Sequence, residues 1–127
     1  AFLAECDILV EMLPATAETR GLIDAEALAA LPRGAKLVNV GRGSTLDEAA
    51  LLAALRSGQI AEATLDVFAV EPLPSDHPFW TMDQVLVTPH LASVAVPETA
   101  ARQVVANCRR VLAGETPEYT VDRRRGY

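Results

Sequence analysis

The stretch Leu37–Gly58, LVNVGRGSTLDEAALLAALRSG, contains the pattern that decides the fold. A short apolar run stops at a glycine, an arginine stands between two glycines, and a helical pattern follows. Thr45 and Glu48 have the spacing of a capping box, so we expect the helix to begin just after Thr45 and to end at Gly58. A buried strand followed directly by a helix is typical of parallel α/β folds.

The same alternation continues on both sides of this stretch. The expected strands are 6–14, 35–40, 63–68 and 85–90, and the expected helices are 24–34, 46–58 and 97–114. Asp24 is the predicted N-cap of the first helix, and Gly34 ends it. We expect strand 6–14 to be buried on both faces, as strands of parallel sheets usually are. The order predicts an α/β fold whose parallel strands are joined by right-handed crossovers.

The composition of the chain argues against several classes of partner. The chain has 127 residues and a formal net charge of −6, and its one basic run is Arg123–Arg125 near the end. A nucleic-acid-binding face would need clustered positive charge, so we expect no nucleic-acid partner. No apolar run approaches the roughly 20 residues of a membrane span. Two distant cysteines without metal-ligand spacing predict buried, reduced thiols in a cytoplasmic protein and no metal site.

Three expected strand ends are followed by polar residues of complementary chemistry. Arg42 follows the strand at 35–40, Glu71 follows the strand at 63–68, and His90 ends the strand at 85–90. Taken singly, they could be a surface arginine in a glycine turn, a solvated loop carboxylate and a capped strand-end histidine. However, ligands of open parallel sheets bind beyond the carboxyl ends of the strands, where these three residues could converge.

Their combined chemistry suits the reduction of a 2-oxo acid. An arginine fork can hold a substrate carboxylate through two hydrogen bonds. A histidine can donate a proton to a carbonyl oxygen that is becoming an alkoxide, and a neighbouring carboxylate favours the charged ring and fixes its orientation. Such an acid–base residue commonly contributes a factor of about 10² to 10⁴ in rate.

The segments LVNVGRG, LDVFAVEPLP and VLVTPHLAS together resemble the D-isomer-specific 2-hydroxyacid dehydrogenases. The order arginine, glutamate, histidine and the spacings of 29 and 19 residues match that family. The ending VDRRRGY resembles the tail of its glyoxylate/hydroxypyruvate reductase subgroup. The resemblance implies the second half of a Rossmann-like doubly wound sheet at 1–96, then a crossing helix and tail at 97–127 that return to a substrate domain.

The resemblance also implies a role for each matching residue. Arg42 would bind the carboxylate and carbonyl of the substrate, His90 would be the general acid in reduction, and Glu71 would support the charge of His90. Trp80 would shape the substrate pocket of its own or of a neighbouring subunit. The implied cofactor is NADP or NAD, the implied substrate is glyoxylate or hydroxypyruvate, and the implied assembly is a homodimer. The cofactor-contacting positions would be Leu13, Pro14, Val40, Gly41, Arg42, Asp66, His90 and Ser93.

The glycine-rich phosphate loop of dinucleotide-binding domains does not occur in this sequence. We expect that loop before residue 1, so the 127-residue chain would be the C-terminal part of a longer protein and inactive alone. Strand 6–14 would then form an open sheet edge. Two alternatives to an enzyme remain open at this point, a non-catalytic dinucleotide-binding regulatory module and a fragment that is inert in isolation.

Overall fold

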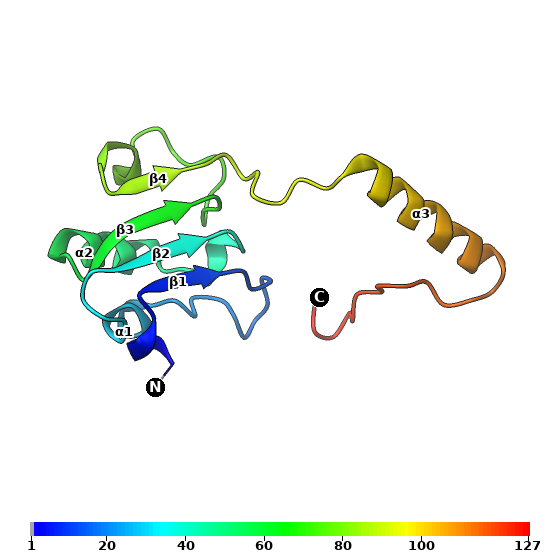
Figure 1. The fold of residues 1–127 in the computed structure, drawn as a ribbon, viewed down its shortest axis with the longest axis horizontal. Coiled ribbons are helices and arrows are strands. Elements are labelled where there is room, and N and C mark those ends of the chain that lie inside the picture. The colour runs from blue at the N-terminus through cyan, green and yellow to red at the C-terminus, as the bar shows by residue number, and fades with distance from the viewer. Residues whose placement is uncertain (1) are drawn as a thin grey trace. The chain divides into compact units, whose positions relative to one another are not determined.

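The computed structural model of the chain describes residues 2–127, which divide into two compact units. The first unit ends at Ala92 and the second runs from Ser93 to Tyr127. The first contains a four-stranded parallel sheet in the order β1-β2-β3-β4 (Figure 1). Its strands are β1 (Ile8–Glu11), β2 (Ala35–Asn39), β3 (Ile60–Leu65) and β4 (Val85–Val87). The expected parallel α/β fold is confirmed.

Two α-helices and two short 3-10 helices connect the strands of the first unit, and a third 3-10 helix precedes β1. The α-helices are α1 (Ala25–Ala29) and α2 (Glu48–Ser57), and the 3-10 helices are η1 (Leu3–Glu5), η2 (Gly43–Thr45) and η3 (Pro78–Thr81). Leucines of both α-helices are buried in one cluster with Leu9 of β1 and Leu37 of β2. Both helices therefore cover the same face of the sheet, as crossovers of one hand require when strands are added in one direction.

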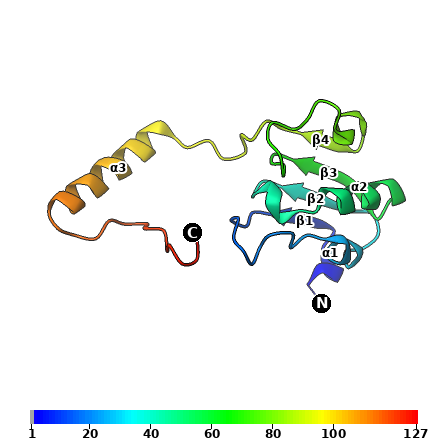
Figure 2. The same cartoon turned by 180° about the vertical axis from the view of Figure 1, so that it is seen from behind.

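The opposite face of the sheet explains why one expectation about β1 was wrong. The burial of β1 alternates, and Ile8 and Val10 are 58% and 51% exposed, whereas Leu9 and Glu11 are buried. Within residues 2–92, α1 and α2 cover only the face that Leu9 and Glu11 share. Strand β1 pairs only with β2 and so forms the expected sheet edge (Figure 2). The apolar run predicted a strand correctly but overstated its burial.

The boundaries of α2, α1 and β3 differ from their expected places. Helix α2 begins at Glu48, because the carboxylate of Asp47 caps it by accepting from the amide of Ala50 at 3.0 Å, while Thr45 lies in η2. Gly58 ends α2 in the left-handed region, as predicted. Helix α1 has the predicted cap, Asp24, but it ends at Ala29, ahead of the proline at position 32 that cannot continue a helix. Strand β3 lies about three residues earlier than expected.

The second unit is the helix α3 (Pro97–Leu112), with a tail that folds back on it. Proline occupies the first turn, as predicted. The side-chain amide of Asn107 exchanges two hydrogen bonds with the backbone of Glu118, and Arg110 donates to the carbonyl of Thr116 at 2.8 Å. The predicted apolar face of this helix is exposed, including Val104 and Leu112. Cys108 is exposed and Cys6 is half-buried, so the prediction of two buried thiols was wrong.

Candidate active site

The turn after β2 is built by a buried asparagine. Asn39 is fully buried, its side-chain oxygen accepts from the amide of Gly41 at 3.1 Å, and its side-chain nitrogen lies 3.5 Å from the carbonyl oxygen of Arg42. The hydroxyl of Thr45 donates to that same carbonyl at 2.6 Å. The backbone of Arg42 is therefore fixed from two sides. Sequence reasoning overlooked Asn39, although a lone amide at the end of an apolar strand, two residues before a glycine, was a usable signal.

The second glycine of this turn is required by a close approach of two backbones. A Cβ atom at Gly43 would overlap the carbonyl group of Phe68 and would lie 2.5 Å from the amide nitrogen of Ala69. The Gly43 backbone thus packs directly on the segment that follows β3. This contact explains why an arginine here is followed by a glycine, and it joins the Arg42 turn to the loop that contains Glu71.

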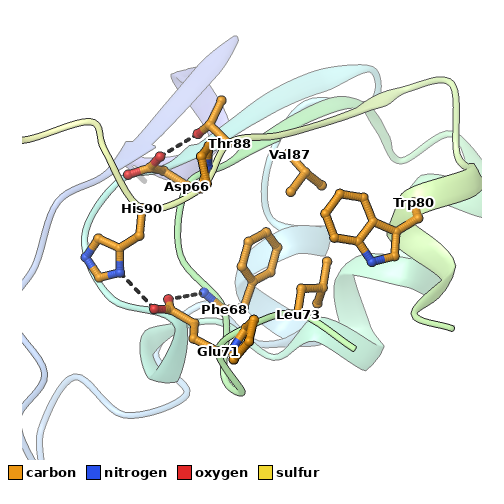
Figure 3. Close-up of a pocket in the computed structure, with 10 residues that line it drawn as sticks. Asp66, Phe68, Glu71, Leu73, Trp80, Val87, Thr88 and His90 are labelled. Carbon is orange, nitrogen blue, oxygen red and sulfur yellow. Dashed lines mark hydrogen bonds and ion pairs between the residues drawn. The ribbon is translucent and has the colours of Figure 1, made fainter. Parts of the chain in front are cut away.

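Glu71 and His90 form a hydrogen-bonded pair across two loops (Figure 3). Nδ1 of His90 lies 2.8 Å from Oε2 of Glu71, and Oε1 of Glu71 accepts from the amide of Phe68 at 2.9 Å. The bond to His90, and then the bond from Phe68, hold the pKa of Glu71 below its ordinary 4.5 in spite of partial desolvation. His90 has φ +51°, a left-handed conformation that a residue with a side chain rarely adopts.

Asp66 holds the backbone on both sides of His90. Its side chain is 2% exposed, accepts from the hydroxyl of Thr88 and from the amide of Leu91 at 3.0 Å, and accepts from the amide of Ala92 at 2.8 Å. Burial raises the pKa of Asp66, but the hydrogen bonds from the hydroxyl and the two amides outweigh it and lower that pKa below 3.8. The bonds stabilise the unusual backbone of His90, which sequence reasoning did not foresee.

A cavity of about 620 Å³ opens beside this pair, and it contains one further predicted residue, Trp80. The indole of Trp80 is half-exposed and donates to the carbonyl of Pro74 at 2.8 Å. The residues that line the cavity are Asp66, Phe68, Glu71, Pro72, Leu73, Trp80, Val87, Thr88, Pro89 and His90 (Figure 3). Arg42 lies outside this lining, and its Nη1 donates to the carbonyl of Gly41 at 2.7 Å. The structure thus brings together Glu71, His90, Asp66 and Trp80, but not the Arg42 guanidinium.

Four of the remaining predicted cofactor residues, Leu13, Pro14, Val40 and Gly41, follow the carboxyl ends of β1 and β2. The amide of Leu13 donates to the buried carboxylate of Glu11 at 2.7 Å, and a Cβ at Gly41 would meet that carboxylate. Pro14 and Val40 lie beside them in the chain. Ser93 is the first residue of the second unit. The contacts of these residues with a cofactor stay predictions.

The chemistry of the cavity suits the nicotinamide end of a dinucleotide. Its walls are largely apolar, and Oδ2 of Asp66 accepts one hydrogen bond and has capacity for another, such as one from a carboxamide. Within residues 2–127, no group of three or more histidine, cysteine, aspartate or glutamate side chains is placed to hold a metal ion. The same residues contain no helix long and apolar enough to span a membrane.

Comparison with known proteins finds a matching family and several similar sequences. The family described as D-isomer specific 2-hydroxyacid dehydrogenase, NAD binding domain, matches residues 1–92. The glyoxylate/hydroxypyruvate reductase A of Yersinia enterocolitica is 47% identical over 127 residues, which make up 100% of this chain and 41% of the relative. That of Serratia proteamaculans is 46% identical with the same coverage. The chain thus spans about two fifths of the length of these relatives.

Solved structures agree with this comparison. A D-isomer specific 2-hydroxyacid dehydrogenase from Xanthobacter autotrophicus, in complex with NADPH and MES, is 67% identical, with a TM-score of 0.96 over 99% of this chain and 52% of that one. The NADPH-dependent glyoxylate/hydroxypyruvate reductase of Sinorhizobium meliloti, in complex with NADP and sulfate, is 38% identical, with a TM-score of 0.94 over 99% of this chain and 42% of that one.

Proposed function

Because the chain belongs to the D-isomer specific 2-hydroxyacid dehydrogenase family, we propose that the whole protein reduces a small 2-oxo acid to the D-2-hydroxy acid with NAD(P)H. We further propose glyoxylate or hydroxypyruvate as the substrate, because relatives that match the full chain bear the name of that activity. NADPH is the proposed cofactor, since two structural relatives were solved with NADPH or NADP. A homodimer is the proposed assembly, by resemblance to the family.

The observation that supports this function best is the His90–Glu71 pair at the carboxyl ends of the strands. When bound, the dinucleotide supplies the hydride. Because Nδ1 of His90 is engaged by Glu71 at 2.8 Å, Nε2 is the ring nitrogen left to face a substrate carbonyl oxygen. His90 then donates its Nε2 proton to that oxygen as it becomes an alkoxide, and Glu71 stabilises the ring while it is charged.

Arg42 is the proposed carboxylate-binding residue. Its side chain is exposed, and the hydrogen bond to its neighbour Gly41 engages only one of the donors of its guanidinium. A small rotation would leave the fork free for a carboxylate, which arginine binds through two parallel hydrogen bonds. Asp66 is proposed to accept from the nicotinamide carboxamide, and Trp80 to limit the size of the substrate.

Steady-state oxidation of NADPH and NADH by the whole protein tests this function, with glyoxylate and hydroxypyruvate as substrates. We expect turnover with both acids, and we expect Arg42→Ala to abolish it while the affinity for NADPH, measured by calorimetry, stays within about twofold. Arg33→Ala is the matched control, because that exposed arginine donates to the carbonyl of Ser57, away from the site. Cofactor binding without turnover of any 2-oxo acid would instead indicate a regulatory module.

A further inference from the structure

A second carboxylate, Glu48, contacts the loop that contains Glu71. Glu48 lies in the first turn of α2, and its Oε1 accepts from the amide of Ala69 at 2.8 Å. Its side chain is only 19% exposed, so this bond is partly shielded from water. No role is given to Glu48 by the chemistry described above, since it is not among the residues that line the cavity.

The position of Ala69 gives this bond its significance. Ala69 directly follows Phe68, whose amide donates to Glu71 at 2.9 Å. Two consecutive amides are therefore bound by two carboxylates, one from within the loop and one from the start of α2. Gly43 packs on the same peptide group. The segment Phe68–Glu71 is thus attached at three points, and its position sets where the carboxylate of Glu71 meets His90.

His77 limits the freedom of Glu48 from the other side. Nε2 of His77 lies 3.8 Å from Oε2 of Glu48, and Nδ1 of His77 accepts from the amide of Phe79 at 3.3 Å. The ring of His77 also packs against that of Phe79, with 4.5 Å between their centres. With one oxygen bound to Ala69 and the other facing His77, the Glu48 carboxylate has little room to rotate.

We propose that Glu48 is a positioning residue for the Glu71–His90 pair, acting through the amide of Ala69. This inference rests on the proposed reductase function for its kinetic consequence, but its structural part does not. A glutamate in the first turn of a helix also stabilises that helix through the macrodipole. The two roles have different requirements. The interaction with the helix dipole requires only a negative charge, whereas the bond to Ala69 requires a hydrogen-bond acceptor on a side chain as long as that of glutamate.

Three substitutions of Glu48 separate charge from reach. Glu48→Asp keeps the charge but is shorter by one methylene, Glu48→Gln keeps the acceptor at full length without the charge, and Glu48→Ala removes both. Glu26 is the matched control, since it occupies the first turn of α1 behind the same kind of aspartate cap and is exposed. Glu26→Ala removes the same charge–dipole interaction without touching the site.

Kinetics of the whole protein with NADPH and glyoxylate provide the first measurement. Misplacing a catalytic group by about 1 Å can cost about a hundredfold, so a loosened pair should lower kcat by about ten- to a hundredfold in Glu48→Ala and Glu48→Asp. KM for glyoxylate should change less than about twofold, because Arg42 is untouched. Glu48→Gln should restore most of kcat, and Glu26→Ala should match the wild type. An active Glu48→Asp variant beside an impaired Glu48→Gln variant would overturn the inference.

Hydrogen exchange of the Phe68–Glu71 segment in the same proteins provides the second measurement, which does not depend on turnover. Exchange should be about tenfold faster in Glu48→Ala and Glu48→Asp than in Glu48→Gln, Glu26→Ala and the wild type, because a lost hydrogen bond opens the segment locally. Equal exchange in all five proteins would refute the positioning role. If the wild type reduces no 2-oxo acid, the proposed function fails, and the exchange rates still decide the role of Glu48.

Discussion

Gly43→Ala places a methyl group inside the peptide that joins Phe68 to Ala69. The added Cβ would overlap the carbonyl group of Phe68 and lie 2.5 Å from the amide nitrogen of Ala69, whereas real Cβ atoms stay beyond 3.0 Å. The obstacle is backbone and not the end of a flexible side chain, so the peptide itself must move. Its amide donates to Glu48 at 2.8 Å and the amide of the preceding peptide donates to Glu71 at 2.9 Å, and that movement would stretch both hydrogen bonds.

The expected cost follows from these contacts. Overpacking a tight site typically costs about 1–3 kcal/mol, and a hydrogen bond to a charged group contributes about 1.5–3 kcal/mol. Both amides can regain water once displaced, so we discount the hydrogen-bond loss and expect Gly43→Ala to lower the free energy of unfolding by about 2–4 kcal/mol. Reductase activity should fall with it, because the loop that contains Glu71 is displaced.

Gly41→Ala is the matched control for this substitution. There the three atoms nearest to the added Cβ are all in the carboxylate group of Glu11, which is the end of a side chain and not backbone. We expect it to cost about 1 kcal/mol, the typical effect of a point mutation. Urea unfolding of the whole protein, followed by circular dichroism, measures both variants. A Gly43→Ala variant within about 0.5 kcal/mol of the wild type, with full activity, would refute the close approach of these backbones.

Three further predictions follow from capping and charge. The pKa values of Glu71 and Asp66 are lowered from 4.5 and 3.8, so both carboxylates stabilise the fold fully at a pH above these ordinary values. This stabilisation is lost as the pH falls through the lowered pKa values. In Asp66→Asn, the urea midpoint of unfolding should therefore fall less steeply with decreasing pH than in the wild type. Asp47→Ala should lower stability by about 1 kcal/mol in thermal unfolding, and an unchanged stability of Asp47→Ala would contradict the capping assignment. Glu71→Gln should reduce kcat by about 10²-fold without weakening the binding of NADPH. An unchanged kcat would show that Glu71 does not stabilise the charged ring of His90.

Most of the fold could be predicted because strand and helix periodicity are local signals. The apolar runs, the aspartate before α1 and the glycine after α2 located every strand and α-helix. The face of β1 that lies open could not be predicted, since burial depends on which elements cover a strand and not on the strand itself. The start of α2 was misplaced because two residues, Thr45 and Asp47, were both suitable caps; the hydroxyl of Thr45 donates to the carbonyl of Arg42, and Asp47 accepts from the amide of Ala50.

The part of the candidate site that depends on the types of residue at the strand ends could be predicted from the sequence. The contact between Glu71 and His90 could be foreseen from the rule that strand ends converge, and it is present at 2.8 Å. The roles of Asp66 and Glu48 in holding backbone amides could not, because their bonds join residues 21 to 26 positions apart and leave no local pattern, whereas the bond of Asn39 to Gly41 is local and was overlooked. The position of the Arg42 guanidinium also could not be predicted from the sequence, since a long exposed side chain can bind any acceptor within its reach, here the carbonyl of Gly41.

The proposed reduction requires that Arg42 and His90 converge on one substrate, and a crystal structure of the whole protein with NADP and oxalate, an unreactive dicarboxylate, tests this convergence. We expect the Arg42 guanidinium and Nε2 of His90 both to lie at hydrogen-bond distance, about 2.7–3.2 Å, from the same oxalate ion. Oxalate bound beside the nicotinamide by other residues, with Arg42 still directed at Gly41, would contradict it.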